Sequence, residues 1–326
     1  MDNNAPLDCL IVGGGPAGLT AAIYLSRFHL DVIVVDEGKS RASWIPCSHN
    51  HAGYPEGING NELLGLMRAQ AQKYGTRIES GRVHRIDKDG DLFTADWGAG
   101  PMQARSVLLA TGLSNRKPPM DMELHDDAMA RGLIRYCPIC DGYEVTDKKV
   151  GVIGSGKNGV GEALFLRSYT ADVTLIAPDK AMDLAEEDRR KLEEAGVRLV
   201  DGPAEAIGVT GACITVDSAE GLMTFDSIYP ALGSDTHTQL AEMLGAELAQ
   251  DGCVLCDEKM RSTVEGFYAA GDVVHGLDQI SHAMGEGGQA ATTIRNDLAA
   301  KRPMLRQPAV MLEGSETARE EIEEGD

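Results

Sequence analysis

Two cysteines three positions apart, Cys137 and Cys140, are the residues of this chain best suited to chemistry, and they lie in the stretch YCPICDG. One turn of helix brings thiols at this spacing together, and the helix N-terminus favours the thiolate of the leading cysteine. Pro138 restricts the backbone and helps to start that helix. Asp141 follows at once and could deliver or accept the proton that thiol–disulfide exchange moves. The pattern therefore predicts a redox-active dithiol with a neighbouring acid/base group.

A second pair at the same spacing, Cys253 and Cys256, leaves a zinc site open as an alternative, because two such pairs can supply four thiolates. This pair, however, lies in a strand-like stretch, where residues three apart point to opposite faces. We therefore expect no metal and interpret both as ordinary buried thiols, like Cys9 and Cys213 in apolar strands. Seven cysteines in a long chain do not suggest a disulfide scaffold. Cys47 lies in a loop and has no assigned role.

A glycine motif, Gly13-x-Gly15-x-x-Gly18, lies between a short apolar run and a helical pattern. Its spacing allows a tight turn, close approach of the backbone to a pyrophosphate, and close packing of helix on strand. The helix N-terminus then faces the phosphates. A second apolar run ends in Asp36 and Glu37, about 20 residues beyond the motif, where an acid binds a ribose hydroxyl. These elements together predict a dinucleotide-binding unit.

The same order of elements returns at residues 149–176. An apolar run leads into Gly154-x-Gly156-x-x-Gly159, a helix-like segment follows, and another apolar run closes the unit. Asp179 lies about 20 residues beyond Gly159, where an acid suits a free ribose 2′-hydroxyl and hence NADH. The alternative for Asp179 is a loop acid without a ligand. The chain thus predicts a second nucleotide site, with NADH favoured over NADPH.

The layout of the remaining segments predicts how these units are arranged. Alternating segments at residues 105–111, 213–216 and 266–270 are interpreted as further strands. Because the second unit interrupts a layout that resumes near Ala246, we expect an α/β fold with two Rossmann-like dinucleotide-binding domains, the second inserted into the first. The expected boundaries are 1–117 and 246–303 for the first domain, 118–245 for the domain that carries the cysteine pair, and 304–326 for an acidic tail.

Charge and hydropathy exclude several partners. With 30 basic against 51 acidic residues the net charge is −21, which argues against nucleic acid or anionic lipid. The N-terminus has no basic stretch typical of a signal peptide, and no run of ~18 apolar residues could span a bilayer. We therefore expect a cytoplasmic protein without a membrane partner. The acid-rich segment Glu313–Asp326 is interpreted as a solvated end rather than a binding tail.

Taken together, these motifs resemble the low-molecular-weight thioredoxin reductase family of FAD-dependent pyridine nucleotide-disulfide oxidoreductases. The resemblance covers about residues 7–300, and it is specific above all because the cysteine pair and its acid stand just before the second glycine motif. The matching stretches are GGGPAGLTAAIY at Gly13–Tyr24, YPEGINGNEL at Tyr54–Leu63, LLATG at Leu108–Gly112, CPICDG at Cys137–Gly142, GEALFLR at Gly161–Arg167 and AAGDV at Ala269–Val273.

The resemblance implies an FAD domain in two segments, a homodimer, and an inserted domain that swings between two orientations. One orientation puts the disulfide against the flavin, and the other brings nicotinamide there and exposes the dithiol to its partner. By the same resemblance, Cys140 would face the flavin, Cys137 would attack a substrate disulfide, and Asp141 would be the acid/base.

The resemblance also implies where FAD binds. Asp272, which follows Gly271 at the end of a strand, would hold the ribityl chain, and Gln279 and Ile280 would lie near the flavin ring. Asn50 is retained in the loop beside the flavin. The complete set expected at the FAD site is Gly13, Gly15, Gly18, Asp36, Glu37, Asn50, Gly271, Asp272, Gln279 and Ile280.

Three departures from the family leave the substrate and donor open. The stretch Ala177–Lys180 and Asp183 stand where members that use NADPH carry arginines, which predicts either NADH over NADPH or no nicotinamide site at all. The loop RASWIPCSHNH brings His49 and His51, either as a base for thiol oxidation or as hydrogen-bonded loop residues. The residues between the two cysteines, Pro and Ile in place of the family's Ala and Thr, suggest a different redox poise or partner.

Three functions remain as alternatives. The leading one passes electrons from a reduced nicotinamide through FAD and Cys137–Cys140 to a disulfide substrate, either a thioredoxin-like protein or a small molecule. The second is a dithiol oxidase that passes electrons from a substrate dithiol through FAD to oxygen, or a related enzyme with a non-nicotinamide donor. The third is a non-catalytic regulator that binds flavin or zinc.

Overall fold

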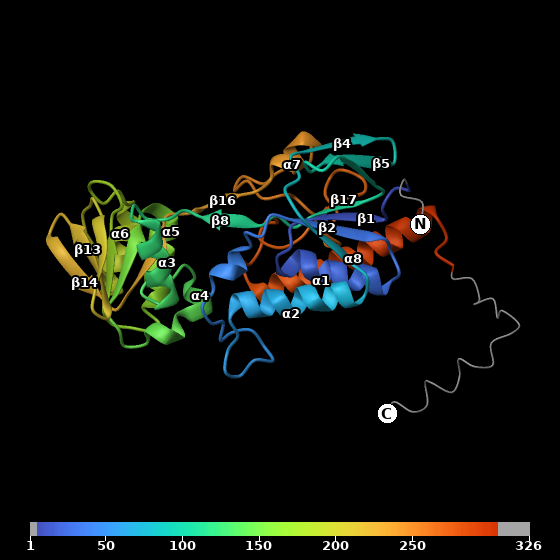
Figure 1. Ribbon diagram of the computed structural model, residues 1–326. Coiled ribbons are helices and arrows are strands. Elements are labelled where there is room, and N and C mark those ends of the chain that lie inside the picture. Colours follow the sequence, from blue (N-terminus) through green and yellow to red (C-terminus); the bar gives the residue numbers. More distant parts are fainter. Residues whose placement is uncertain (1–4, 306–326) are drawn as a thin grey trace, which may run out of the picture.

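The chain forms two lobes that lie side by side (Figure 1). The computed structural model describes residues 5–305, so the expected acidic tail lies outside the described residues apart from its first two positions. One lobe holds the first glycine motif, and the other holds the cysteine pair and the second motif. Among the described residues, no helix combines the length and the apolar character needed to cross a bilayer.

The first lobe is built on a five-stranded parallel sheet in the order β17-β7-β1-β2-β3. Its central strands are buried along their whole length, as strands covered on both faces must be. The strands are β1 (Cys9–Val12), β2 (Val32–Asp36), β3 (Arg77–Ser80), β7 (Val107–Leu109) and β17 (Phe267–Ala269).

Helices cover one face of this sheet, and a small antiparallel sheet covers the other (Figure 1). The helices are α1 (Pro16–Arg27), α2 (Gly60–Lys73) and α8 (Ile280–Lys301). The small sheet has the order β4-β5-β6, formed by β4 (Arg85–Asp89), β5 (Leu92–Asp96) and β6 (Pro101–Ala104). A short 3-10 helix, η1 (Arg41–Trp44), and α7 (Gln239–Met243) complete the lobe.

Small residues let α8 approach α1 closely. A Cβ atom added at Gly287 would lie 2.3 Å from the backbone oxygen of Ala17, which no real side chain tolerates. Ala283, Ala290 and Ala291 extend the same buried face of α8. Because this packing brings the start of α8 against the start of α1, the C-terminal segment of the chain contributes to the site that the first glycine motif begins.

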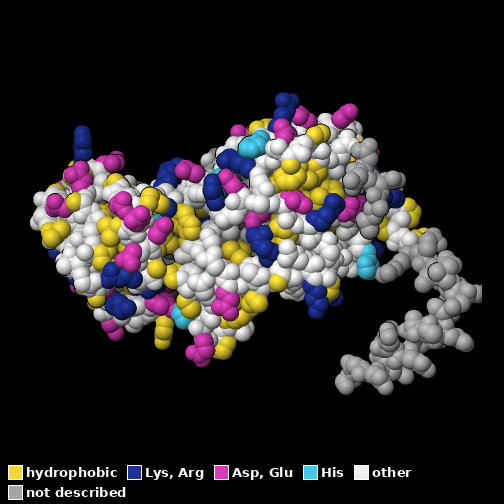
Figure 2. Space-filling view, in the orientation of Figure 1, with side chains coloured by type: hydrophobic (Ala, Val, Ile, Leu, Met, Phe, Trp, Pro, Cys, Tyr) yellow, Lys and Arg dark blue, Asp and Glu magenta, His cyan; other side chains and the backbone are white. Residues whose placement is uncertain are grey.

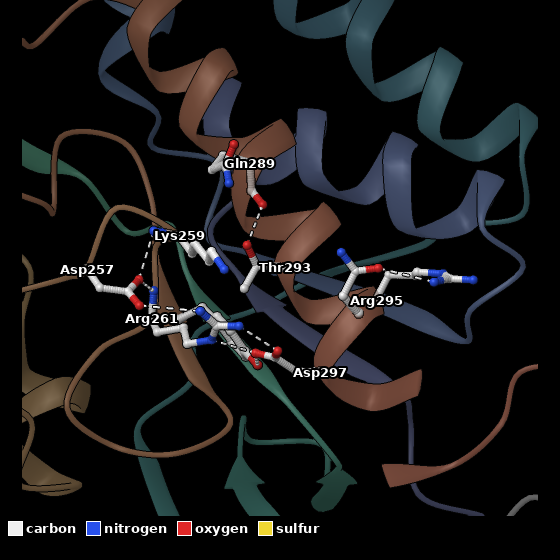
Figure 3. Close-up of polar contacts among 9 residues, drawn as sticks. Asp257, Lys259, Arg261, Gln289, Thr293, Arg295 and Asp297 are labelled. Carbon is white, nitrogen blue, oxygen red and sulfur yellow. Dashed lines mark hydrogen bonds and ion pairs between the residues drawn. The ribbon is translucent and has the colours of Figure 1, made fainter. Parts of the chain in front are cut away.

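An ion pair holds the C-terminal part of α8 against the sheet (Figure 3). The Arg261 guanidinium donates to both carboxylate oxygens of Asp297 at 2.7 and 2.6 Å, and Tyr268 Oη donates to the same carboxylate at 2.8 Å. Asp257 receives the backbone amides of Lys259 and Arg261 at 2.8 and 2.9 Å. These bonds hold the loop before β17 against the helix that follows it.

The second lobe repeats the parallel arrangement on a smaller scale, with the strand order β11-β10-β9-β15. Its strands are β9 (Val150–Gly154), β10 (Val173–Ile176), β11 (Arg198–Val200) and β15 (Ser227–Ala231). A three-stranded antiparallel sheet is formed by β12 (Glu205–Thr210), β13 (Cys213–Ser218) and β14 (Gly221–Phe225). The helices are α3 (Met122–Ala130), α4 (Pro138–Asp141), η2 (Tyr143–Val145), α5 (Gly156–Leu166) and α6 (Glu186–Glu194).

A two-stranded antiparallel ribbon joins the lobes (Figure 1). The chain leaves the first lobe through β8 (Leu113–Asn115) and returns through β16 (Ser234–Thr236), with Arg116 donating to Asp235 at 3.0 and 2.6 Å. The first lobe's sheet takes β7 from before this excursion and β17 from after it. The expected fold class, two Rossmann-like domains with the second inserted into the first, is therefore confirmed.

Candidate active site

Cys137 and Cys140 form a disulfide at the edge of the second lobe. Cys137 is the N-cap of the short helix α4, Pro138 takes the first helical position, and the two Cα atoms lie 5.2 Å apart. The backbone N–H of Cys140 donates to the Cys137 sulfur at 3.2 Å. The leading sulfur therefore receives a backbone N–H at the start of a helix, which is an environment that stabilises a thiolate.

Asp141 lies in a half-buried pocket behind the disulfide. Its carboxylate accepts a hydrogen bond from Arg135 Nη1 at 3.0 Å and another from Tyr229 Oη at 3.0 Å. Burial raises the pKa of this carboxyl above its usual range, although Arg135 and the Tyr229 hydrogen bond act in the opposite direction. A carboxyl whose pKa is raised toward neutrality is better matched to donating and accepting protons at physiological pH.

The first lobe meets the disulfide through Gln279, the N-cap of α8. Its amide nitrogen lies 3.3 Å from the Cys137 sulfur and 3.2 Å from the Cys140 sulfur. Its amide oxygen accepts a hydrogen bond from Asn50 Nδ2 at 2.9 Å. Gln279, which is expected at the FAD site, therefore also forms the contact between the lobes at the reactive sulfurs, and Asn50 holds its amide oxygen.

A cavity of about 870 Å³ extends from the first glycine motif to the disulfide. Cys140 and Asp141 line its far end, whereas Cys137 does not line it. Of the ten residues expected at the FAD site, the nine that line this cavity are Gly13, Gly15, Asp36, Glu37, Asn50, Gly271, Asp272, Gln279 and Ile280. The structure thus brings together segments from residues 13–50 and 271–280 around one cavity.

The tenth residue, Gly18, does not line the cavity, because it lies at the contact between helix and strand. A Cβ atom at Gly18 would lie 2.0 Å from the backbone oxygen of Gly13. Gly159 holds the same place in the second motif, where a Cβ atom would lie 2.7 Å from the Gly154 carbonyl carbon. In both motifs the third glycine therefore serves close helix–strand packing.

The residues around the cavity fit FAD. Gly13 has φ +108°, and a Cβ atom there would lie 2.3 Å from the Ala110 oxygen, so the wall of the cavity at this turn is bare backbone. The N-terminus of α1 opens onto the cavity at Gly15, as a pyrophosphate site requires. Asp36 ends β2, where it accepts from the Gly14 amide at 3.1 Å and from Arg68 at 2.6 Å. A buried acid held in this way is suited to bind a ribose hydroxyl.

The sequence did not predict a role for Arg41, which lies between acidic side chains at the middle of the cavity. Its Nη1 lies 3.1 Å from Asp272 and 3.5 Å from Asp278. Burial raises the pKa of Asp278, with a further contribution from Asp272. Across the interface, burial raises the pKa of Glu162 on α5 to about 7, while Arg41 lowers it and Asp141 raises it. One cation of the first lobe therefore lies among acids of both lobes.

The second glycine motif lies between β9 and α5, in the position that the first motif has in its own lobe. Gly156 has φ +54° and open space at its Cβ position. Asp179 follows β10 and is exposed in the loop at the carboxyl ends of the strands. This placement is compatible with a ribose contact.

The loop histidines have different surroundings. His49 lines the cavity together with Cys47. The His51 ring stacks on Tyr54 with centroids 5.6 Å apart, and its Nδ1 lies 3.3 Å from Ser281 Oγ. His51 is thus tied to side chains of its own lobe, and His49 is the loop histidine that faces the cavity.

For the other cysteines, the structure differs in part from what the sequence predicts. Cys9 is buried in β1 as expected, and burial raises its pKa to about 12. Cys213 is only partly buried, because it begins β13 in the small antiparallel sheet. Cys253 and Cys256 are also only partly buried, and they lie in a loop with two isolated bridges at Val254 rather than in a strand. Within residues 5–305 no three His, Cys, Asp or Glu side chains are grouped as metal ligands.

Sequence reasoning also missed the residues that surround Asp141. Arg135 lies six positions before Asp141, so an arginine next to the cysteine motif was a usable signal. Tyr229 comes from β15, 88 positions away, and nothing in its local sequence marks it.

Comparison with known proteins agrees with the observed fold. A family model described as pyridine nucleotide-disulphide oxidoreductase matches residues 7–287. The thioredoxin reductase of Listeria monocytogenes is 30% identical over 295 residues, which cover 87% of this chain and 91% of that protein. Among solved structures, HlmI has a TM-score of 0.84 at 27% identity, covering 92% of this chain and 95% of its own. The thioredoxin reductase of Streptococcus pyogenes has a TM-score of 0.83 at 26% identity, covering 91% and 100%.

Fold, cavity and disulfide together define a flavin-dependent disulfide oxidoreductase. The chain belongs to the pyridine nucleotide-disulphide oxidoreductase family, and within it the chain is thioredoxin reductase-like and FAD-dependent.

Proposed function

We propose that this enzyme transfers electrons from a reduced nicotinamide, through FAD and the Cys137–Cys140 disulfide, to a disulfide substrate. The observation that carries the proposal is that Cys140 lines the same cavity as nine residues expected to bind FAD. When bound, FAD supplies a two-electron carrier at that cavity. A disulfide at the far end of the cavity is placed to exchange electrons with such a carrier.

The two sulfurs have different roles in this proposal. Cys140, which lines the cavity, would be the sulfur that exchanges electrons with bound FAD. Cys137, which does not line the cavity, would be the sulfur that attacks the substrate. Two electrons added to the S–S bond break it and leave one thiolate and one thiol. Asp141 supplies the proton for the thiol and recovers it when the dithiol is oxidised again, and its raised pKa suits both steps.

The electron donor in the proposal is NADH. Asp179 lies beyond the second glycine motif in the position that favours a free 2′-hydroxyl. In the stretch 177–183 only Lys180 is basic, so a 2′-phosphate would meet one cation and two acids. Repulsion by those acids would weaken NADPH relative to NADH.

The substrate is a disulfide carried by a thioredoxin-like protein or by a small molecule. Two apolar side chains beside the sulfurs are exposed, Ile139 at 48% and Tyr143 at 80%. Such side chains at the reactive edge suit a partner that brings its own apolar surface. We further propose a cytoplasmic homodimer with the domain boundaries expected from the sequence.

Turnover on a large substrate requires the second lobe to turn, because Gln279 covers both sulfurs in the present arrangement. The β8–β16 ribbon is a narrow connection about which such a rotation could take place. The rotation would withdraw the disulfide from the cavity and bring the second nucleotide site toward it.

A second candidate is a dithiol oxidase, in which a substrate dithiol becomes a disulfide and two electrons and two protons pass to O₂, giving hydrogen peroxide. Two observations favour it: the scarcity of cations near Asp179, and His49 in the cavity as a base for the substrate thiol. Conversely, the retained second glycine motif favours the reductase.

The experiment that separates these functions mixes the purified flavoprotein anaerobically with NADH or NADPH at equal concentration and follows the flavin absorbance. The proposal predicts rapid bleaching by NADH, slower bleaching by NADPH, and recovery when a disulfide is added. Bleaching by a dithiol alone, with recovery in air, would replace the reductase by the oxidase. Faster bleaching by NADPH would contradict the role of Asp179.

A further inference from the structure

We propose that Asn50 and Gln279 form a positioning pair that holds an amide N–H group on the reactive sulfurs and thereby favours the reduced dithiol. The proposal deepens the proposed function and rests on it, because it assigns to two residues of the cavity a role toward the disulfide as well as toward the flavin. It also explains why the first lobe touches Cys137 and Cys140 through an amide rather than through an apolar side chain.

Three hydrogen bonds in series fix which way the Gln279 amide points. The buried Ser48 hydroxyl lies 3.1 Å from Asn50 Oδ1 and donates to it. The Asn50 amide must then present its nitrogen in the other direction, where Nδ2 donates to Gln279 Oε1 at 2.9 Å. With its oxygen engaged by Asn50, Gln279 presents its NH₂ group to both sulfurs, at 3.3 and 3.2 Å. The Gln279 oxygen lies farther away, 3.7 Å from the Cys140 sulfur alone.

An N–H group in this position distinguishes the oxidation states of the pair. Sulfur in a disulfide is a weak acceptor, whereas a thiolate is a charged one, and hydrogen bonds to ionised groups are about twice as strong as neutral ones. Reduction adds two electrons, breaks the S–S bond and leaves one thiolate and one thiol after a single proton is taken up. The Gln279 amide therefore stabilises the product of reduction more than the disulfide.

Acidic side chains near the disulfide make the N–H donor of Gln279 more important. Asp141 lies beside the sulfurs, and Glu162 and Asp278 lie on the two sides of the interface. Negative charge near a thiolate disfavours it, and Arg135 is already engaged by Asp141. Gln279 brings two N–H donors to the sulfurs without adding a formal charge.

The test measures the equilibrium of the holoenzyme with mixtures of reduced and oxidised dithiothreitol. The state of Cys137 and Cys140 is read by alkylation and peptide mass. We expect Gln279→Leu to shift the equilibrium about tenfold toward the disulfide, the effect of one lost hydrogen bond to a charged group. For a two-electron couple this is a fall in midpoint potential of about 30 mV.

Asn50→Asp is the decisive variant, because Gln279 remains present. A carboxylate at position 50 accepts from the Gln279 NH₂ group and turns its oxygen toward the sulfurs. We expect a larger shift in the same direction, because the added carboxylate also disfavours a nearby thiolate. The further shift of the double variant beyond Gln279→Leu measures this charge effect, and the rest of the Asn50→Asp shift is the positioning effect. Gln289→Leu, the same substitution at an exposed position of the same helix, is the matched control and leaves the potential unchanged.

An unchanged potential in Gln279→Leu would overturn the proposal. A normal potential in Asn50→Asp would remove the positioning role of Asn50. The measurement uses neither a nicotinamide nor a protein substrate, so it stands even where the proposed electron donor is wrong. Conversely, slow reduction of the flavin by NADH in the parent enzyme would count against the proposed function and not against this pair.

Discussion

The Asp141 carboxylate lies 3.0 Å from the Arg135 guanidinium, and both side chains are largely shielded from solvent, at 24% and 17% exposed. The ion pair therefore holds the acid in a partly dehydrated site beside the disulfide. Burial nevertheless dominates and raises the pKa of the Asp141 carboxyl. The pair thus combines a fixed geometry with a carboxyl that is easier to protonate than a free one.

Removing the cation is expected to raise the pKa of Asp141 further, since Arg135 acts to lower it. Because a close opposite charge typically lowers such a pKa by ~1 unit or more, Arg135→Gln should move the pH profile of disulfide reduction to higher pH by about that amount. The profile is measured with a dithiol as reductant. Arg190→Gln, which breaks an exposed ion pair with Glu194 on α6, is the control. Identical profiles for Arg135→Gln and the parent enzyme would show that Asp141 does not limit the reaction.

Glu162 is expected to destabilise the fold at neutral and higher pH. Its Oε2 is buried without a hydrogen-bond partner among the described residues, and burial raises its pKa to about 7. Because the folded-state pKa of Glu162 lies above the unfolded value of ~4.3, protonation of this side chain contributes fully to the stability of the folded state below pH ~4.3. This contribution to stability is lost as the pH rises through about 7.

The variant Glu162→Gln should therefore unfold at higher urea concentration than the parent enzyme at pH 8, by a free energy on the order of 2–3 kcal/mol. The difference should vanish near pH 4. Glu193→Gln, at an exposed position of α6, should match the parent at both pH values. A variant less stable than the parent at pH 8 would mean that the ionised Glu162 is paired favourably in the folded enzyme.

Trp44 is expected to hold the two lobes in the present arrangement. It comes from η1 of the first lobe, yet its ring packs against Tyr136 and His125 of the second, at centroid distances of 6.1 and 6.2 Å. Lys117 Nζ lies 4.5 Å from the same ring. Because Tyr136 directly precedes Cys137, Trp44→Ala should loosen the lobe contact at the disulfide.

The expected result is a several-fold faster alkylation of Cys137 in the reduced enzyme, since aromatic contacts of this kind contribute ~1 kcal/mol. Trp44→Phe keeps a ring in place and should stay close to the parent rate. If alkylation is equally fast in all three proteins, the lobe arrangement does not depend on Trp44.

Asp36 is expected to be the main side-chain contact to the adenosine ribose of FAD. It is buried at the end of β2, whereas the neighbouring Glu37 is exposed and paired with Lys39 at 2.8 Å. Asp36→Ala should weaken FAD binding about tenfold or more, as expected for loss of a hydrogen bond to a charged group. Glu37→Ala should have little effect. The release of FAD during dialysis measures FAD binding in both variants. Equal retention of FAD in the two variants would contradict the assignment of Asp36 as the ribose contact.

The local parts of this account could be predicted from the sequence because they depend on residues near one another in the chain. Each glycine motif with its flanking strands is such a part, and the close contacts of Gly18 and Gly159 have the form that the spacing predicts. The disulfide at Cys137 and Cys140 is another, since one helical turn brings both sulfurs together.

The contacts that tune the site could not be predicted, because they join residues far apart in the sequence. Gln279 meets sulfurs 139 and 142 positions away, and Tyr229 meets Asp141 across 88 positions. These contacts depend on how the lobes and strands pack, which periodicity does not encode. The same limit explains the error at Cys253–Cys256, where an apolar stretch is a loop in which only Val254 forms isolated bridges, to Leu248 and Val274.

The central claim is that the flavin exchanges electrons with the Cys137–Cys140 disulfide, and an anaerobic titration with a dithiol tests it most directly. The flavin absorbance is followed in the parent enzyme and in the variants Cys137→Ser and Cys140→Ser. The account predicts that dithiothreitol bleaches the parent flavin rapidly and that oxidised dithiothreitol in large excess restores it, while both variants respond at least a hundredfold more slowly, on the order of the losses that follow removal of a nucleophile. Equal bleaching rates in the parent and in both variants would show that electrons reach the flavin without the disulfide, and would contradict the account.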